Sequence, residues 1–137
     1  MQNKDKYKIL LKHIGWLQAL AGDVAAPGPE ADKGTIRQTH LFVERKYKED
    51  FQRFHEDFYE SGLLDKEYIL NVEKLGYGNR RLPTHADIRK TELAPLLSIL
   101  TAYIRSLHWG WGDEWVNDAV DGTYLAILLR LRELTGN

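Results

Sequence analysis

The chain contains 137 residues, with 19 Lys and Arg against 20 Asp and Glu, a formal net charge of -1 and no cysteine. This length fits a single domain over residues 1–137, which can bury a core without disulfides or a structural metal. The lack of cysteine excludes thiolate zinc sites, iron–sulfur clusters and cysteine nucleophiles. A net charge near zero removes the general attraction to nucleic acid or anionic lipid that a basic domain has, so the composition does not favour either partner.

No segment of the sequence has the character of a secretion signal or a membrane span. Lys12 and His13 interrupt the first apolar segment, and the longest apolar segment, Leu93 to Ile104, is shorter than the roughly 20 residues that a span requires. We therefore expect a soluble cytoplasmic protein.

The first apolar residues recur at the spacing of an amphipathic helix, which predicts a helix from Lys4 to Ala21. Its apolar face comprises Tyr7, Leu10, Leu11, Ile14, Leu17 and Ala21. The segment from Gly22 to Ile36 is rich in glycine and proline and lacks apolar periodicity, which predicts a loop. The loop is long for a helical domain, so we expect it to be mobile or functional.

An aromatic stripe predicts a second helix from Thr39 to Glu60. Its members are Phe42, Tyr47, Phe51, Phe54 and Phe58. Asp65 is placed to cap a short helix that runs through Leu75 and that Gly76 would stop. A basic loop with Arg80 and Arg81 follows, from Gly76 to Pro83.

The next predicted helix is leucine-rich, begins after Thr91 and ends at Leu107, and we expect it to lie at the centre of the fold. The tryptophan corner Trp109-Gly110-Trp111-Gly112 separates it from a last helix that starts near Asp113. Gly122 falls inside that last helix at a cost of about 1 kcal/mol relative to alanine, which suggests that another group approaches its backbone closely.

No segment has the strict alternation of a strand, and no glycine-rich phosphate-binding motif is present. These features predict an all-α fold, an irregular antiparallel bundle of about five helices.

Several short motifs in the second half resemble a bacterial family described as domain of unknown function 6508. The resemblance rests on Leu100 to Arg105, Trp109, Gly112, Ala119, Gly122, the segment Leu128 to Leu131, and the upstream segment Phe58 to Leu64. It spans about residues 42–134 and implies a small all-α bacterial protein, without implying a mechanism. The sequence departs from the family at His108-Trp109-Gly110-Trp111, where a shorter turn is expected.

Arg105 is a charged residue in a mostly apolar predicted helix, so its guanidinium needs a carboxylate or an anion nearby. We expect a salt bridge to Asp118 or Asp121, and the alternative is an anion of a substrate or partner. Tryptophans 109, 111 and 115 lie within seven residues of sequence, a density typical of a small core or an interface. A stacking platform for a base or sugar is a third interpretation, although it would need a basic track nearby.

Carboxylates recur at helical spacing in two places, and these could face one another. Glu56 and Glu60 lie on the second predicted helix, and Asp118 and Asp121 lie on the last. Helical nucleotide pyrophosphatases hold Mg²⁺ between such helices, because this ion prefers oxygen ligands and substrate phosphates. Acidic residues on helices more often form a solvated face. His55-Glu56 lacks the second histidine of a zinc motif, and no serine lies in a nucleophile elbow.

We therefore expect a non-enzymatic helical protein that needs no cofactor and binds a protein partner, or a second copy of itself as a homodimer. The expected binding residues are Arg105, Trp109, Trp111 and Trp115. The alternative is a Mg²⁺-dependent nucleotide pyrophosphohydrolase that uses Glu56, Glu60, Asp118 and Asp121. A third hypothesis, nucleic-acid binding, would use the Arg80-Arg81 loop.

Overall fold

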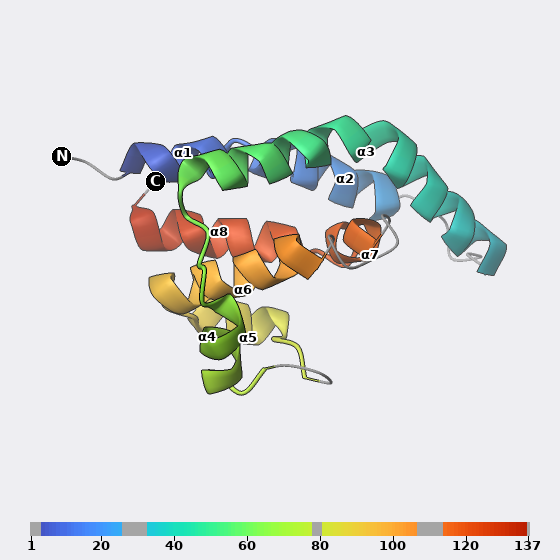
Figure 1. Cartoon of the computed structure of the whole chain (residues 1–137). Helices are drawn as coiled ribbons and strands as arrows, with labels where there is room; N and C mark the ends of the chain where they lie inside the picture. The colour runs from blue at the N-terminus through green and yellow to red at the C-terminus, as the bar shows by residue number, and fades with distance from the viewer. Residues whose placement is uncertain (1–3, 26–32, 78–80, 107–113, 137) are drawn as a thin grey trace.

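A computed structural model describes residues 4–25, 33–77, 81–106 and 114–136, and it confirms the all-α fold class. The described residues form eight helices (Figure 1). Their bounds are α1 Lys4–Leu11, α2 Ile14–Ala25, α3 Lys33–Ser61, α4 Tyr68–Lys74, α5 His85–Lys90, α6 Leu93–Ser106, α7 Glu114–Val120 and α8 Thr123–Thr135. None of the helices in this part of the chain is long and apolar enough to cross a membrane.

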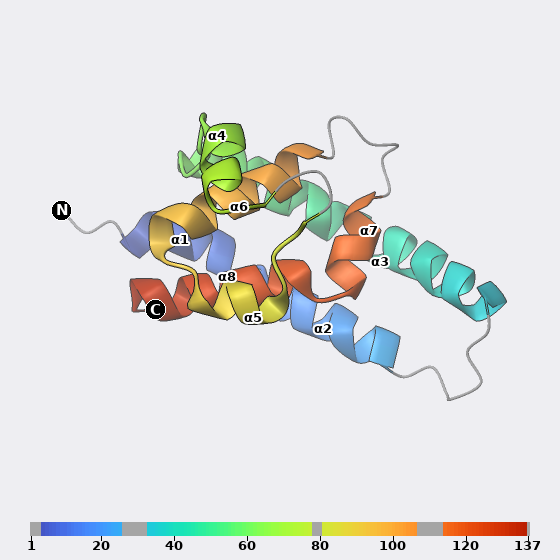
Figure 2. The ribbon, with the colours of Figure 1, turned by 90° about the horizontal axis from the view of Figure 1, so that it is seen from below.

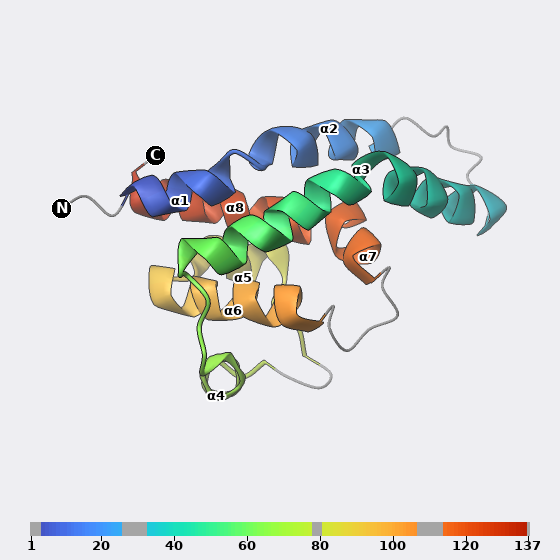
Figure 3. The ribbon, with the colours of Figure 1, turned by 45° about the horizontal axis from the view of Figure 1, so that its top comes forward.

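The helices stack in layers around α8. Helices α1 and α2 follow one another along one side, and α3 runs back beside them in the opposite direction (Figures 1 and 3). Helices α5 and α6 pack on the other side of α8, and α4 lies outermost, against α6 (Figures 1 and 2). This arrangement leaves α4 on the rim of the molecule.

The central helix is α8, which corrects the expectation that the leucine-rich α6 has this position. Helix α8 packs against α1, α2, α5, α6 and α7, whereas α6 contacts mainly α4 and α8. Tyr124, Ile127, Leu128 and Leu131 of α8 are completely buried and recur at the i, i+3, i+4, i+7 spacing of a helix.

The first predicted helix is in fact two helices, α1 and α2, with a break at Lys12 and His13. The His13 amide donates to the carbonyl of Leu10 at 3.0 Å, so the turn tightens before α2 begins. The apolar spacing continues across the break, because Leu10, Ile14 and Leu17 are all buried.

Helix α3 is longer than the predicted helix and uses its aromatic stripe as expected, with one exception. Tyr47, Phe51, Phe54 and Phe58 are buried, but Phe42 is 47% exposed and Val43 takes its place in the core. Val43 precedes Tyr47 by four residues, which keeps it on the buried face, whereas Phe42 precedes it by five. The predicted loop from Gly22 to Ile36 is helical at both ends, and residues 26–32 lie outside the described residues.

Helix α5 was not predicted from the sequence. Thr84 and Asp87 form a reciprocal capping box, in which each side chain accepts a hydrogen bond from the other's backbone amide at 3.0–3.1 Å. Thr91, predicted to start the next helix, instead follows the end of α5, and its hydroxyl donates to the carbonyl of Asp87.

The last predicted helix is also two helices, because Gly122 separates α7 from α8. Gly122 has a left-handed backbone with φ of 86°, which glycine adopts without the strain that a Cβ causes. A Cβ there would lie 3.3 Å from Cε1 of His85, so the close approach expected at Gly122 is made by α5. The two divided helices and the missed α5 account for eight helices instead of five.

Candidate functional site

The tryptophans predicted to bind a partner do not form one described surface. Trp109 and Trp111 lie outside the described residues. Trp115 is 4% exposed and its ring stacks on Phe51, with the ring centroids 4.7 Å apart. Trp115 is therefore a core residue, the first of the three interpretations given for the tryptophan run, and a partner could not contact it without rearrangement of the core.

Arg105 faces α4, not the last two helices. Its guanidinium lies over the ring of Tyr68, at 5.8 Å from the centroid, and its buried Nε atom has no hydrogen-bond partner among the residues that the structure describes. The expected salt bridge to Asp118 or Asp121 is not among the ion pairs of the described side chains.

The charges of Asp118 and Asp121 act instead on a tyrosine of the same helix as Arg105. Burial, together with these two carboxylates, raises the pKa of Tyr103 to about 12. Tyr103 and Arg105 are two positions apart, which places them on different sides of α6. Arg105 thus belongs to the α4 side of the molecule.

The four carboxylates of the alternative enzyme hypothesis do not form a metal site. Glu56 and Glu60 are exposed on α3, and Asp121 is exposed next to Gly122. Across the described part of the chain, no three His, Asp or Glu side chains gather closely enough to hold a metal ion. Because both are exposed, Glu56 and Glu60 belong to a solvated face of α3.

The basic loop offers only part of the surface that nucleic-acid binding would require. Arg80 lies outside the described residues, and Arg81 is exposed and lies over the ring of Tyr77 at 5.6 Å from the centroid. Tyr77 and Arg81 close the end of α4, so this contact has a local structural role.

A buried polar cluster joins the α1–α2 break to α3. The indole Nε1 of Trp16 donates to Nδ1 of His13 at 2.8 Å, and Nε2 of His13 lies 2.7 Å from Asp57. Both ring nitrogens of His13 are therefore occupied, and the residue is 4% exposed. A general base needs a ring nitrogen that can reach substrate, so this His–Asp pair serves the fold.

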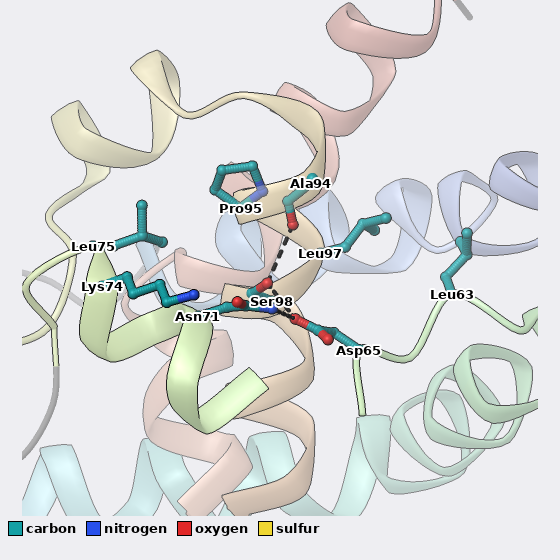
Figure 4. A pocket seen from close by; sticks show the side chains of 9 residues that line it. All are labelled: Leu63, Asp65, Asn71, Lys74, Leu75, Ala94, Pro95, Leu97 and Ser98. Atoms are coloured by element: carbon teal, nitrogen blue, oxygen red, sulfur yellow. Dashed lines mark hydrogen bonds between the residues drawn. The ribbon is translucent and has the colours of Figure 1, made fainter. Parts of the chain in front are cut away.

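A pocket between α4 and α6 was not anticipated from the sequence (Figure 4). Its volume is about 460 Å³, within the range of small-molecule sites. Leu63, Leu75, Ala94, Pro95 and Leu97 form its apolar walls, and Asp65, Asn71, Lys74 and Ser98 supply its polar groups.

Asp65 organises the polar side of the pocket. One carboxylate oxygen accepts hydrogen bonds from Ser98 and from Asn71 (2.7 Å), and the other accepts from the amide of Glu67 at 2.9 Å. The hydrogen bond from Ser98, with those from Asn71 and Glu67, lowers the pKa of Asp65 despite partial burial. The lowered pKa keeps the carboxylate ionised. Because all three donors are neutral, none of them compensates its negative charge.

Two hydroxyl residues in the leucine-rich helix α6 could have indicated this pocket, but the apolar pattern around them made them easy to overlook. Ser98 and Thr101 are buried polar residues, 3% and 0% exposed, on the face of α6 that meets the segment before α4. The backbone amide of Asp65 donates to Thr101 at 3.0 Å. Buried hydroxyl groups in a leucine-rich helix require partners, and here Asp65 provides them.

An exposed stripe lies on α4 and the turn before it; we call it the α4 stripe and define it as Lys66, Ile69, Leu70 and Glu73. All four side chains are exposed, and Ile69 and Leu70 expose 59% and 57% of their surface. The spacing of Ile69, Leu70 and Glu73 places these three side chains on one face of α4, and Lys66 lies in the turn that precedes the helix. None of the α4 residues is buried.

Comparison with known protein families, with curated proteins and with solved structures gave no match for this chain. The resemblance to the domain of unknown function 6508 therefore stays a prediction. Functional inference rests on the geometry of the chain itself.

Proposed function

We propose that this chain is a protein-binding module that acts as a weak homodimer through the α4 stripe. The observation that carries the proposal is the exposure of Ile69 and Leu70 on a helix that buries none of its side chains. Large apolar side chains grouped on a surface are typical of sites that another protein covers. We keep the predicted kind of partner, a protein or a second copy of the chain. We propose the α4 stripe, instead of the tryptophans, as the contact surface.

The charges of the α4 stripe favour a second copy of this chain as the partner. Lys66 and Glu73 flank the apolar pair at opposite ends. If two α4 helices pair antiparallel across a two-fold axis, Ile69 and Leu70 meet their own copies. Each Lys66 then meets Glu73 of the second copy, so one surface complements itself. A net charge of -1 opposes such association little.

Arg105 contacts Tyr68 of α4, next to the α4 stripe, so one of the predicted binding residues lies beside the proposed interface. Its guanidinium covers Tyr68, the residue before Ile69, and its Nε atom is a donor without an acceptor in the described part of the chain. Arginine and tyrosine are both enriched where interfaces concentrate binding energy.

Four side chains cover much less than the roughly 800 Å² per partner of a stable complex, so we expect a dimer in rapid exchange with the monomer. Sedimentation velocity over increasing protein concentration measures this exchange directly. The double variant Ile69→Asn, Leu70→Asn should remain monomeric at concentrations where the natural chain associates.

The matched control is the double variant Leu41→Asn, Phe42→Asn, which removes two exposed apolar side chains from α3, 45% and 47% exposed. It should associate like the natural chain. A natural chain that stays monomeric at all concentrations, or equal loss of association in both double variants, would contradict the proposal.

A further inference from the structure

The pocket between α4 and α6 contains two opposite charges that no ion pair neutralises. Asp65 is held ionised by three neutral donors. Lys74 lines the same pocket, and its amine makes no ion pair or hydrogen bond within the described part of the chain. In Figure 4 the side chains of Lys74, Asn71, Ser98 and Asp65 converge on one side of the pocket.

A further acceptor lies between these two charges. Asn71 uses its amide nitrogen to donate to Asp65 at 2.7 Å, and among the hydrogen bonds of the described residues its Oδ1 atom accepts none. An amide oxygen has two acceptor positions, and a carboxylate has about four, of which Asp65 uses three here. Asp65 and Asn71 can therefore accept hydrogen bonds from an ammonium group of a ligand. Lys74 can donate hydrogen bonds to a carboxylate of the same ligand.

The remaining walls are aliphatic. Leu63, Leu75 and Leu97 surround the pocket together with Ala94 and Pro95, and none of the described residues that line it is aromatic. A purely cationic ligand would meet the charge of Lys74, and a purely anionic ligand would meet that of Asp65. A ligand with both charges and an aliphatic chain complements the charged groups and the aliphatic walls of the pocket together.

We infer that this pocket binds an aliphatic α-amino acid such as L-leucine. The ligand's ammonium group lies against Asp65 and Asn71, its carboxylate against Lys74, and its side chain among the three leucines. The site is distinct from the α4 stripe, and the inference holds whether or not the chain dimerises.

Isothermal titration calorimetry with L-leucine tests the inference, with three analogues that each lack one feature. Glycine lacks the aliphatic chain, 4-methylpentanoic acid lacks the amine, and 3-methylbutan-1-amine lacks the carboxylate. We expect saturable binding of one leucine per chain. The two analogues that lack a charged group should bind at least about tenfold more weakly, since a hydrogen bond to a charged group contributes about that factor. Glycine should also bind at least about tenfold more weakly, because it loses the burial of the aliphatic side chain.

Two variants of exposed pocket residues locate the site. Lys74→Met should weaken leucine binding about tenfold or more, and Ala94→Trp should abolish it by filling the pocket. The matched control Lys90→Met removes an exposed lysine of α5 that does not line the pocket, and it should bind leucine like the natural chain. Circular dichroism checks that each variant is folded.

Absence of heat with leucine at millimolar concentration would overturn the inference. Unchanged leucine binding by Ala94→Trp would overturn it too, as would an analogue that binds as tightly as leucine. The double variant Ile69→Asn, Leu70→Asn should bind leucine like the natural chain, which separates this test from that of the dimer.

Discussion

The indole nitrogen of Trp16 donates a hydrogen bond to Nδ1 of His13 at 2.8 Å. Because Nδ1 must then present a lone pair, the proton of the neutral ring lies on Nε2, which donates to Asp57. One indole thus fixes the tautomer of a buried histidine at the break between α1 and α2. Protonation of His13 would place a second N–H against the indole N–H.

The first prediction concerns stability between neutral and acid pH. Burial lowers the pKa of His13 below 6.5, and this effect outweighs the opposing hydrogen bond and charge of Asp57. Below pH 6.5 the unfolded chain therefore binds more protons than the folded chain, so stability falls as pH falls. Urea unfolding at pH 7.5 and pH 5.5 should give a lower free energy at pH 5.5.

The variant Trp16→Phe separates His13 from the carboxylates that also titrate in acid. It removes the donor to Nδ1, so the pKa of His13, followed by NMR, should rise toward its ordinary value. If the histidine of the natural chain titrates at or above pH 6.5, the proposed network is wrong.

The second prediction concerns Gly122, which separates α7 from α8. Gly122→Ala places a Cβ on a left-handed backbone and 3.3 Å from His85, so it should destabilise the fold by about 1–3 kcal/mol. Gly22→Ala is the matched control, because Gly22 lies inside α2 with no atom near the added Cβ. That control should stabilise by about 0.5–1 kcal/mol. Urea denaturation measures both, and equal effects would contradict the assignment.

The third prediction tests the position of Trp115. Trp115→Ala removes a ring that stacks on Phe51 in the core and should cost about 3–5 kcal/mol. Phe42→Ala removes an exposed ring of α3 and should change stability by less than about 1 kcal/mol. A Trp115→Ala variant as stable as the natural chain would place the indole on the surface instead.

The fourth prediction concerns the polar link between Asp65 and α6. The hydrogen bond from Ser98 is the largest cause of the lowered pKa of Asp65. Ser98→Ala should therefore raise this pKa toward 3.8 and destabilise the fold by about 1 kcal/mol. An NMR titration of the carboxyl carbon measures the pKa, and an unchanged value would show that the hydrogen bond is absent. Asn71→Ala, which removes a smaller cause, should raise the pKa by less.

Local patterns predicted most of the helices, because amphipathic spacing is a property of a short window. The aromatic stripe of α3 and the leucine-rich α6 both followed from that spacing. The break at His13 did not, and the side chain that His13 contacts there, Asp57, lies 44 positions away. Gly122 was visible as an anomaly, but only the structure shows its left-handed backbone and its close approach to His85.

The candidate sites were harder to predict, because a surface depends on which face each helix buries. Trp115 belongs to a dense tryptophan run, yet α7 turns its ring onto Phe51. Ile69 and Leu70 look like ordinary core residues in the sequence, and only the outermost position of α4 exposes them. The pocket needs Asp65 and Ser98 together, and 33 positions separate them.

The most direct test of the proposed dimer mixes two charge-reversed chains. Lys66→Glu alone places Glu opposite Glu73 of its copy, and Glu73→Lys alone places Lys opposite Lys66, so each variant should associate less than the natural chain. Mixed in equal amounts, the two variants restore both ion pairs. Sedimentation velocity should then show a heterodimer that neither variant forms alone, whereas a mixture no more associated than its two components would contradict pairing through α4.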